Sequence, residues 1–146
     1  MLLTGFCGDQ HDPELAGRWT AMQAAAGAEV QFAMLDGGRA GAIAACLEAC
    51  IRAIGNVREW TVEDPVFLAS AVAENGVAVE AAVAGFLGGR FTDRRIGLEE
   101  PEAVRLVLAR DVDAALAVRI AALRAAILAG SVAVPEHHDG PEWMPG

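Results

Sequence analysis

The 146-residue sequence contains no lysine and no tyrosine, and aromatic side chains make up only 5% of it. The missing lysine excludes Schiff-base catalysis and the lysine of a phosphate-binding P-loop. The scarcity of aromatic residues means that a core has to be built mainly from Ala, Val, Leu and Ile. Because hydrophobic residues still make up 54% of the chain, intrinsic disorder is excluded.

Positive charge is also scarce. Eleven arginines face 20 acidic residues, which gives a formal net charge of −9. Binding to duplex nucleic acid or to an anionic membrane surface needs an excess of cations. The composition therefore argues against both partners.

Long apolar runs are absent as well. The richest stretch, residues 112–128, is interrupted by Asp113, Arg119 and Arg124, so no segment reaches the ~18 apolar residues of a membrane helix. The apolar residues 1–6 are too short for a signal peptide and lack a basic flank. The chain as given predicts a soluble protein without an export signal, and its length predicts one domain.

The three cysteines are too few for a disulfide framework. Cys46 and Cys50 are four residues apart, so we expect them on one helix face as small buried side chains. The histidine pair His137-His138, with Glu136 and Asp139 beside it, lies in a Pro- and Gly-rich segment that indicates a solvated terminus. The sequence therefore predicts no metal and no cofactor.

Short apolar segments alternate with helical patterns along the chain. Strands are expected at residues 1–6, 29–35, 53–57, 66–70 and 104–108, with weaker β character at 94–98. Helices are expected from Asp12 to Gly27, from Gly41 to about Ala53, from Asn75 to Gly88, and from Asp111 or Asp113 to Gly130. This alternation predicts a three-layer α/β/α fold with a mainly parallel sheet. Residues 1–135 form one lobe in this interpretation, and residues 136–146 form a flexible tail.

In such folds, ligands bind outside the carboxyl ends of the strands. The loops expected there are residues 7–12, 36–41, 56–64 and 71–75. The segment Asp36-Gly-Gly-Arg-Ala-Gly41 follows a strand and opens a helix, so its glycines suit either a small ligand or a tight turn. It matches no nucleotide-binding motif.

Other interpretations of this end of the fold stay open. Cys7 with Asp9 and His11 could form a nucleophilic pair, although Asp12 has a capping role, and we expect no enzymatic activity. The loop tryptophans Trp60 and Trp143 are either contact residues or partly buried staples.

The order of several short motifs resembles a known family. These motifs are Leu2-Leu-Thr-Gly5, Asp12-Pro-Glu-Leu-Ala16, Gly27-Ala-Glu-Val-Gln-Phe32, Asp36-Gly-Gly38, Ile54-Gly55, Leu68-Ala-Ser70, Ala78-Val79, Gly88-Gly-Arg-Phe91, Ile96-Gly-Leu98, Leu123-Arg-Ala-Ala-Ile127 with Gly130, and Val134-Pro135. Together they resemble the second lobe of the basic membrane protein family, the purine-nucleoside-binding lipoproteins of ABC transporters. The resemblance extends over nearly the whole chain.

The resemblance implies a single lobe of the type I periplasmic-binding fold, a location outside the cytoplasm, and a nucleoside-like solute. It implies that ligand-binding residues lie in the loops after the strands: Phe32, Asp36, Gly37, Gly38, Glu59 and Trp60. The family's G-V-D-x-D-Q segment reads Gly55-Asn-Val-Arg-Glu-Trp60 here, and its lysine is replaced by Ala73. The groups implied to grip the ribose and the base edge are thus altered.

Two functions follow from these patterns. The first is a solute-binding lobe that acts with a second lobe or as a homodimer, because one lobe alone cannot bury most of a ligand's surface. The second is an oligomeric structural or assembly domain that has kept the fold and lost the ligand.

Overall fold

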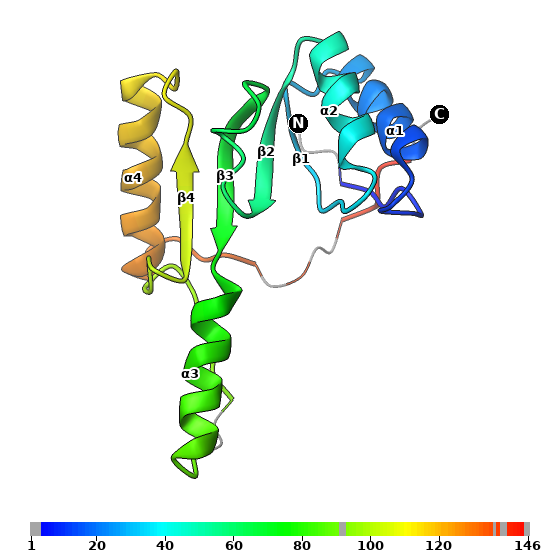
Figure 1. Ribbon diagram of the computed structural model, residues 1–146. Coiled ribbons are helices and arrows are strands. Elements are labelled where there is room, and N and C mark those ends of the chain that lie inside the picture. Colours follow the sequence, from blue (N-terminus) through cyan, green and yellow to red (C-terminus); the bar gives the residue numbers. More distant parts are fainter. Residues whose placement is uncertain (1–3, 91–92, 136, 138–139, 145–146) are drawn as a thin grey trace.

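Helices and strands alternate along the chain in the computed structural model, which describes residues 4–90, 93–135, 137 and 140–144 (Figure 1). The elements are α1 (Pro13–Ala25), β1 (Val30–Phe32), α2 (Arg39–Glu48), β2 (Arg52–Val57), β3 (Phe67–Ala73), α3 (Asn75–Leu87), β4 (Val104–Leu108) and α4 (Ala114–Leu128).

The four strands form one sheet in the order β1-β2-β3-β4. The pairs β1–β2 and β2–β3 are parallel, and β4 runs antiparallel to β3. The expected α/β class and mainly parallel sheet are therefore confirmed. Because β1, β2 and β3 point the same way, their carboxyl ends lie at one edge of the sheet.

The first helix begins and ends where the sequence predicts. The Asp12 carboxylate accepts hydrogen bonds from the backbone N–H groups of Glu14 and Leu15, at 2.8 and 3.1 Å. Gly27 follows the helix with a φ of 94°, a left-handed conformation that favours glycine. The N-cap and the glycine thus fix both ends of α1.

Helices α1 and α2 pack closely because glycine lies where they meet. A Cβ atom on Gly41 would overlap the carbonyl of Pro13, so only glycine fits there. A polar network joins the two helices to β1. The buried Thr20 hydroxyl donates to the Ala16 carbonyl at 2.8 Å and accepts from the Gln31 amide at 2.7 Å, and the Cys46 thiol donates to the other end of that amide at 3.5 Å.

The buried apolar residues form two small clusters around α2. One joins Cys46 to the sheet residues Ala53 and Phe67 and to Val66, which precedes β3. The other joins Ala16 of α1 to Leu35 and Ala42. The core is therefore built on the β1–β2 side of the sheet, under α1 and α2.

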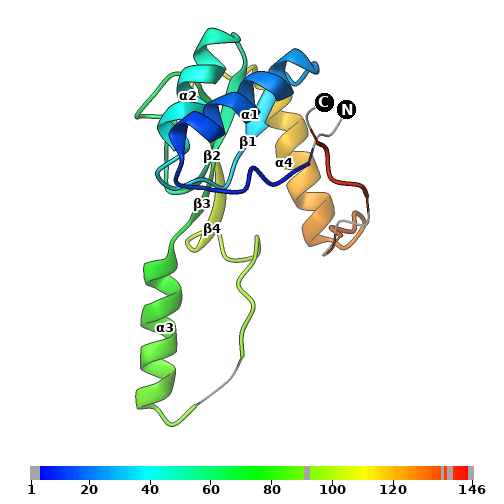
Figure 2. The same ribbon diagram turned by 90° about the vertical axis from the view of Figure 1, so that its right-hand side faces the viewer.

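The other two helices are much less covered. Helix α4 lies beside β4, at the opposite end of the row of strands from α1 and α2 (Figure 1). Helix α3 projects past the end of the sheet in both views (Figures 1 and 2). Neither helix has a buried residue. The sequence predicted helices on the sheet, and for α3 this prediction is wrong.

Several expected boundaries also differ. Of the expected strand at 1–6, residues 1–3 lie outside the described residues. Thr4–Phe6 are not a strand: Phe6 is exposed, and the Thr4 carbonyl accepts from the Trp143 amide instead. The strand expected at 29–35 is shorter, and residues 94–98 form no strand.

Helix α2 ends at Glu48, five residues before the expected end. Cys50 therefore lies beyond the helix, exposed and with a φ of 55°, while Cys46 is fully buried. The expected shared helix face is wrong.

Part of the carboxyl-terminal segment packs against the first helix. The rings of Trp143 and Trp19 meet edge to face, with centroids 5.7 Å apart. Trp143 is thus a partly buried staple that joins the two ends of the described chain. Three residues of the expected histidine cluster, Glu136, His138 and Asp139, lie outside the described residues.

Candidate functional site

The loops that follow β1 and β2 meet beside the loop that precedes α1. We call this group, residues 10–12, 32–39 and 56–61, the strand-end rim. The carbonyl of Gln10 accepts hydrogen bonds from the amides of Asp36 and Gly38, at 3.1 and 3.0 Å. The rim is therefore one connected surface at the carboxyl ends of the parallel strands, where the sequence pattern predicted it.

Two glycines allow the chain segments of the rim to approach each other. A Cβ atom on Gly37 would lie 2.9 Å from the His11 carbonyl oxygen, and one on Gly38 would lie 2.9 Å from that of Gln10. Both distances are too short for a side chain. The geometry thus gives Gly37 and Gly38 a packing role, which was one of the two open interpretations of this turn.

Three of the exposed side chains at the rim are Phe32, Asp36 and His11. Phe32 is 54% exposed at the end of β1. The Asp36 carboxylate lies 3.9 Å from His11 Nε2, and both side chains are about two-thirds exposed, at 67% and 64%. An aromatic ring thus lies in the same short segment as an accessible acceptor.

Arg39, the first residue of α2, bridges the loops after β1 and β2. Its guanidinium donates to the Leu35 carbonyl at 2.5 Å and to the Asn56 Oδ1 at 2.6 Å. Burial lowers the pKa of Arg39, opposed by the charge of Asp36 and reinforced by that of Arg58. Arg39 therefore holds the rim together as a partly desolvated cation.

Trp60 covers the end of β2. Its ring lies on Gly55, where any Cβ atom would overlap it. The indole N–H donates to the Asn56 carbonyl at 2.9 Å, and the backbone N–H donates to the buried Ser70 hydroxyl at 2.8 Å. Of the two open interpretations, these contacts favour the staple.

Two arginines flank the same ring. The guanidinium carbons of Arg39 and Arg58 lie 4.3 and 4.0 Å from the Trp60 ring centroid, within the range of cation–π contacts. Arg58 also pairs with Glu63 at 3.2 Å. The inner part of the rim is thus filled by the chain's own side chains.

The backbone is strained at the tip of β2. Val57 has a φ of 70°, which β-branched residues rarely adopt. The Arg58 amide donates to the Asn56 carbonyl at 2.8 Å across this tight turn. Such strained positions occur often at binding sites.

Glu59 lies at the outer part of the rim, half-buried, and its carboxylate accepts from the Thr61 hydroxyl at 3.2 Å. The motifs in the sequence pointed to Glu59 but not to Arg39, Asn56 or Arg58. For Arg39, the available signal was its place at the first turn of a helix that follows a glycine-rich turn. No sequence pattern indicated that it would reach Asn56.

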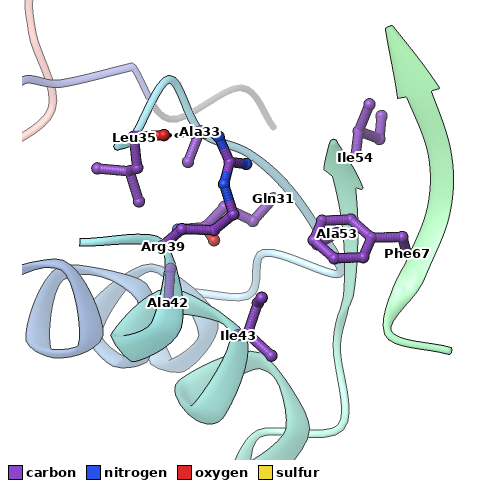
Figure 3. A pocket seen from close by; sticks show the side chains of 9 residues that line it. All are labelled: Gln31, Ala33, Leu35, Arg39, Ala42, Ile43, Ala53, Ile54 and Phe67. Atoms are coloured by element: carbon purple, nitrogen blue, oxygen red, sulfur yellow. Dashed lines mark hydrogen bonds between the residues drawn. The ribbon is translucent and has the colours of Figure 1, made fainter. Parts of the chain in front are cut away.

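A small cavity lies beneath the rim, between α2 and the sheet (Figure 3). Its volume is about 20 Å³, enough for about one water molecule. The lining includes Gln31, Arg39 and Phe67, and Figure 3 shows the Arg39 guanidinium reaching the Leu35 carbonyl. The cavity is far smaller than a solute, so a ligand at the rim would rest on an open surface.

The structure does not bring Cys7 and His11 together as a nucleophilic pair. The Cys7 thiol donates to the Asp9 carbonyl at 3.4 Å, whereas the His11 ring lies near Gln10 and Asp36. Asp12 is engaged as the cap of α1. Across the described part of the chain, no group of three or more His, Cys, Asp or Glu side chains could hold a metal ion. None of the helices there is long and apolar enough to cross a membrane.

Solved structures of other proteins share this fold at low sequence identity. No protein-family model matches the chain, and no curated protein sequence is similar enough to match. A solved structure titled as an ABC transporter system solute-binding protein from Aeropyrum pernix K1 is similar, with a TM-score of 0.69 and 20% identity over 91% of this chain. The similarity confirms the expected single lobe of a periplasmic-binding-protein-like fold.

A second solved structure has a similar fold. It is titled as a transcriptional activator of the comK gene from Bacillus halodurans, with a TM-score of 0.72 and 16% identity over 86% of this chain. The chain covers 45% of that structure and 48% of the solute-binding protein. It therefore spans a little less than half of each.

Proposed function

We propose that this chain is a solute-binding lobe related to the basic membrane protein family, without catalytic activity, that binds a small nucleoside-like solute at its strand-end rim. The observation that carries the proposal is the pairing of an exposed aromatic ring with an exposed carboxylate at the carboxyl ends of parallel strands. The likeness to a solute-binding protein supports it at the level of fold.

The chemistry of the rim suits such a ligand. A carboxylate accepts hydrogen bonds from two neighbouring hydroxyl groups, as on a ribose, and Asp36 provides one. An exposed phenyl ring offers a face on which a base stacks, and Phe32 provides that face. Glu59 and Trp60 are the flanking contacts in this proposal, the exposed Gly37 offers its backbone, and the buried Gly38 supports the turn.

A second wall is part of the proposal. The cavity of about 20 Å³ cannot enclose a nucleoside, and ligand sites bury most of a small ligand's surface. A second lobe or a second subunit therefore closes over the rim. The half-length match to both solved structures agrees with this arrangement.

The test is a thermal-shift screen of the purified chain with nucleosides, sugars and amino acids at millimolar concentration. A nucleoside is expected to raise the melting temperature. Phe32→Ala and Asp36→Ala are expected to abolish the shift, whereas Asp93→Ala, a matched exposed carboxylate outside the rim, keeps it. The absence of any shift in every oligomeric form would overturn the proposal.

A second function is favoured by one observation. Arg39, Asn56 and Trp60 satisfy one another's polar groups, and the described residues include no buried side-chain polar atom without a partner. A rim whose inner polar groups are already hydrogen-bonded within the chain suits an assembly domain that no longer binds a ligand. In that case the screen gives no shift while the chain forms a stable oligomer.

A further inference from the structure

Helix α3 is apolar over most of its surface, and all of its residues except the half-buried Ala78 and Gly85 are exposed. Its large apolar side chains range in exposure from 41% for Val77 to 79% for Leu87. Glu80 is the single charged residue within Asn75–Leu87. A helix that is hydrophobic all round is normally buried, so an exposed one marks an interaction surface.

Helix α4 exposes a second apolar surface of opposite charge. Val118 and Leu123 are 68% and 51% exposed, and they flank Arg119. Arg119 and Arg124 are the two charged residues within Ala114–Leu128. Arg124 donates to the Leu98 carbonyl, whereas among the described residues neither Glu80 nor Arg119 forms an ion pair.

We propose that two copies of this chain associate through these helices, with α3 of one copy packed antiparallel against α4 of the other. Helix α3 projects past the sheet, while α4 lies alongside β4 (Figures 1 and 2). A two-fold axis that relates the two copies would therefore place each α3 against the α4 of the other copy. Such an isologous interface uses the same patch on both copies. Glu80 and Arg119 lie near the middles of their helices, so antiparallel packing brings them within about one turn of each other.

The two helices are large enough for a specific but weak interface. α3 has 13 residues and α4 has 15. Covering half of each helix buries roughly 300 Å² per helix, or roughly 1,200 Å² in a dimer with two such helices per copy. That area lies at the lower end of specific interfaces, about 1,200–2,000 Å² in total. A weak dimer, with a dissociation constant of about micromolar, is expected.

The proposal concerns a surface outside the strand-end rim and does not depend on solute binding. It bears on the site because α3 begins directly after β3, at the edge where the rim lies. The second copy would therefore stand beside the rim.

The test is sedimentation equilibrium of the ligand-free chain over a range that reaches roughly 100 µM, above the expected dissociation constant. Wild type is expected to form a dimer. Val83→Asp in α3 and Val118→Asp in α4 each bury an unpaired charge and should weaken association by about a hundredfold. Val62→Asp, in a loop and 73% exposed, is the matched control and should leave the dimer unchanged.

Charge reversal identifies the pairing of helices. Glu80→Arg and Arg119→Glu should each weaken the dimer by about threefold, and the double variant should restore it. Circular dichroism checks that each variant is folded. A wild-type monomer throughout the range overturns the proposal, as does a dimer that both aspartate variants and the charge reversals leave intact. A solute screen on folded Val83→Asp separates this outcome from a failure of the rim to bind.

Discussion

Within the strand-end rim, Trp60 contacts its neighbours on several sides at once. It lies on Gly55, donates to the Asn56 carbonyl and is flanked by Arg39 and Arg58. The side chains of Phe32 and Asp36 remain open beyond this cluster. At the scale of residues, the rim therefore has a rigid inner part and an accessible outer part.

Val57 provides a direct test of strain at the rim. A valine with a φ of 70° costs about 1–3 kcal/mol, and glycine removes that cost while adding about 0.5–1 kcal/mol of unfolded-state entropy. Val57→Gly is therefore expected to raise the free energy of unfolding by about 1 kcal/mol in urea denaturation. Val62→Gly in the next loop, where φ is not positive, should lower it. Equal destabilisation by both changes would show that Val57 is not strained.

Cys46 gives the protein a pH dependence in the alkaline range. Burial raises the pKa of its thiol from 9.0 to about 11, so the folded state holds a proton that the unfolded state loses first. The contribution to stability is complete below pH 9 and is lost as the pH rises through about 11. Urea unfolding at about pH 8 and about pH 11 should show a loss of about 2 kcal/mol.

The Cys46→Ala variant should lack that loss, although its stability is lower at every pH because it leaves a cavity. The exposed Cys50 is the control, and Cys50→Ala should retain the wild-type slope. A wild-type slope in Cys46→Ala would mean that another group is responsible.

Among the elements, the packing of α1 against α2 positions the first half of the rim. Gly41 allows the contact because any Cβ atom there would overlap the Pro13 carbonyl. Gly41→Ala is expected to destabilise the chain by about 2–3 kcal/mol, the upper range for overpacking. Thermal denaturation measures the effect.

The control for this change is a helical glycine with open space around it. A Cβ atom on Gly76 in α3 would meet no other atom within 4 Å, and Gly76→Ala should stabilise its helix by about 0.5–1 kcal/mol. If Gly41→Ala were as well tolerated as Gly76→Ala, the close packing of α1 on α2 would be wrong.

The local signals in the sequence predicted most elements. The Asp12-Pro13 start and the glycine stops correspond to observed helix boundaries. The strands expected at 53–57, 66–70 and 104–108 are present within a few residues of their expected bounds. The early end of α2 at Glu48 was not predicted, because residues 49–53, apolar apart from Arg52, fit either a helix or a strand. The position of α3 was not predicted either, since its apolar pattern indicates burial without saying against what.

The candidate site was predicted in outline. Loops that follow parallel strands meet at one edge, so Asp36 and Glu59 could be placed at that edge from the strand pattern, whereas Phe32 was indicated by the family resemblance. The bridge from Arg39 to Asn56 spans 17 residues and depends on how α2 packs, which no local pattern specifies. The sequence therefore indicated the outer surface of the rim but not the contacts that support it.

At the scale of the whole molecule, several surfaces of the described chain are left uncovered. The chain covers 45% and 48% of two solved structures, its rim is open, and α3 and α4 have no buried residue. In each case a surface that is suited to burial, either the rim or an apolar helix, is not covered by any other part of the described chain. The dimer proposed above would cover α3 and α4, and the proposed second lobe or subunit would cover the rim.

Binding of a solute at the strand-end rim is tested most directly by an NMR titration of the isotope-labelled chain with a purine nucleoside. We expect the amide shifts to change at Phe32, at Asp36–Gly38 and at Glu59, while those of α4 stay constant. Shifts confined to the exposed helices, or no shift at millimolar nucleoside, would contradict the proposed role of the rim.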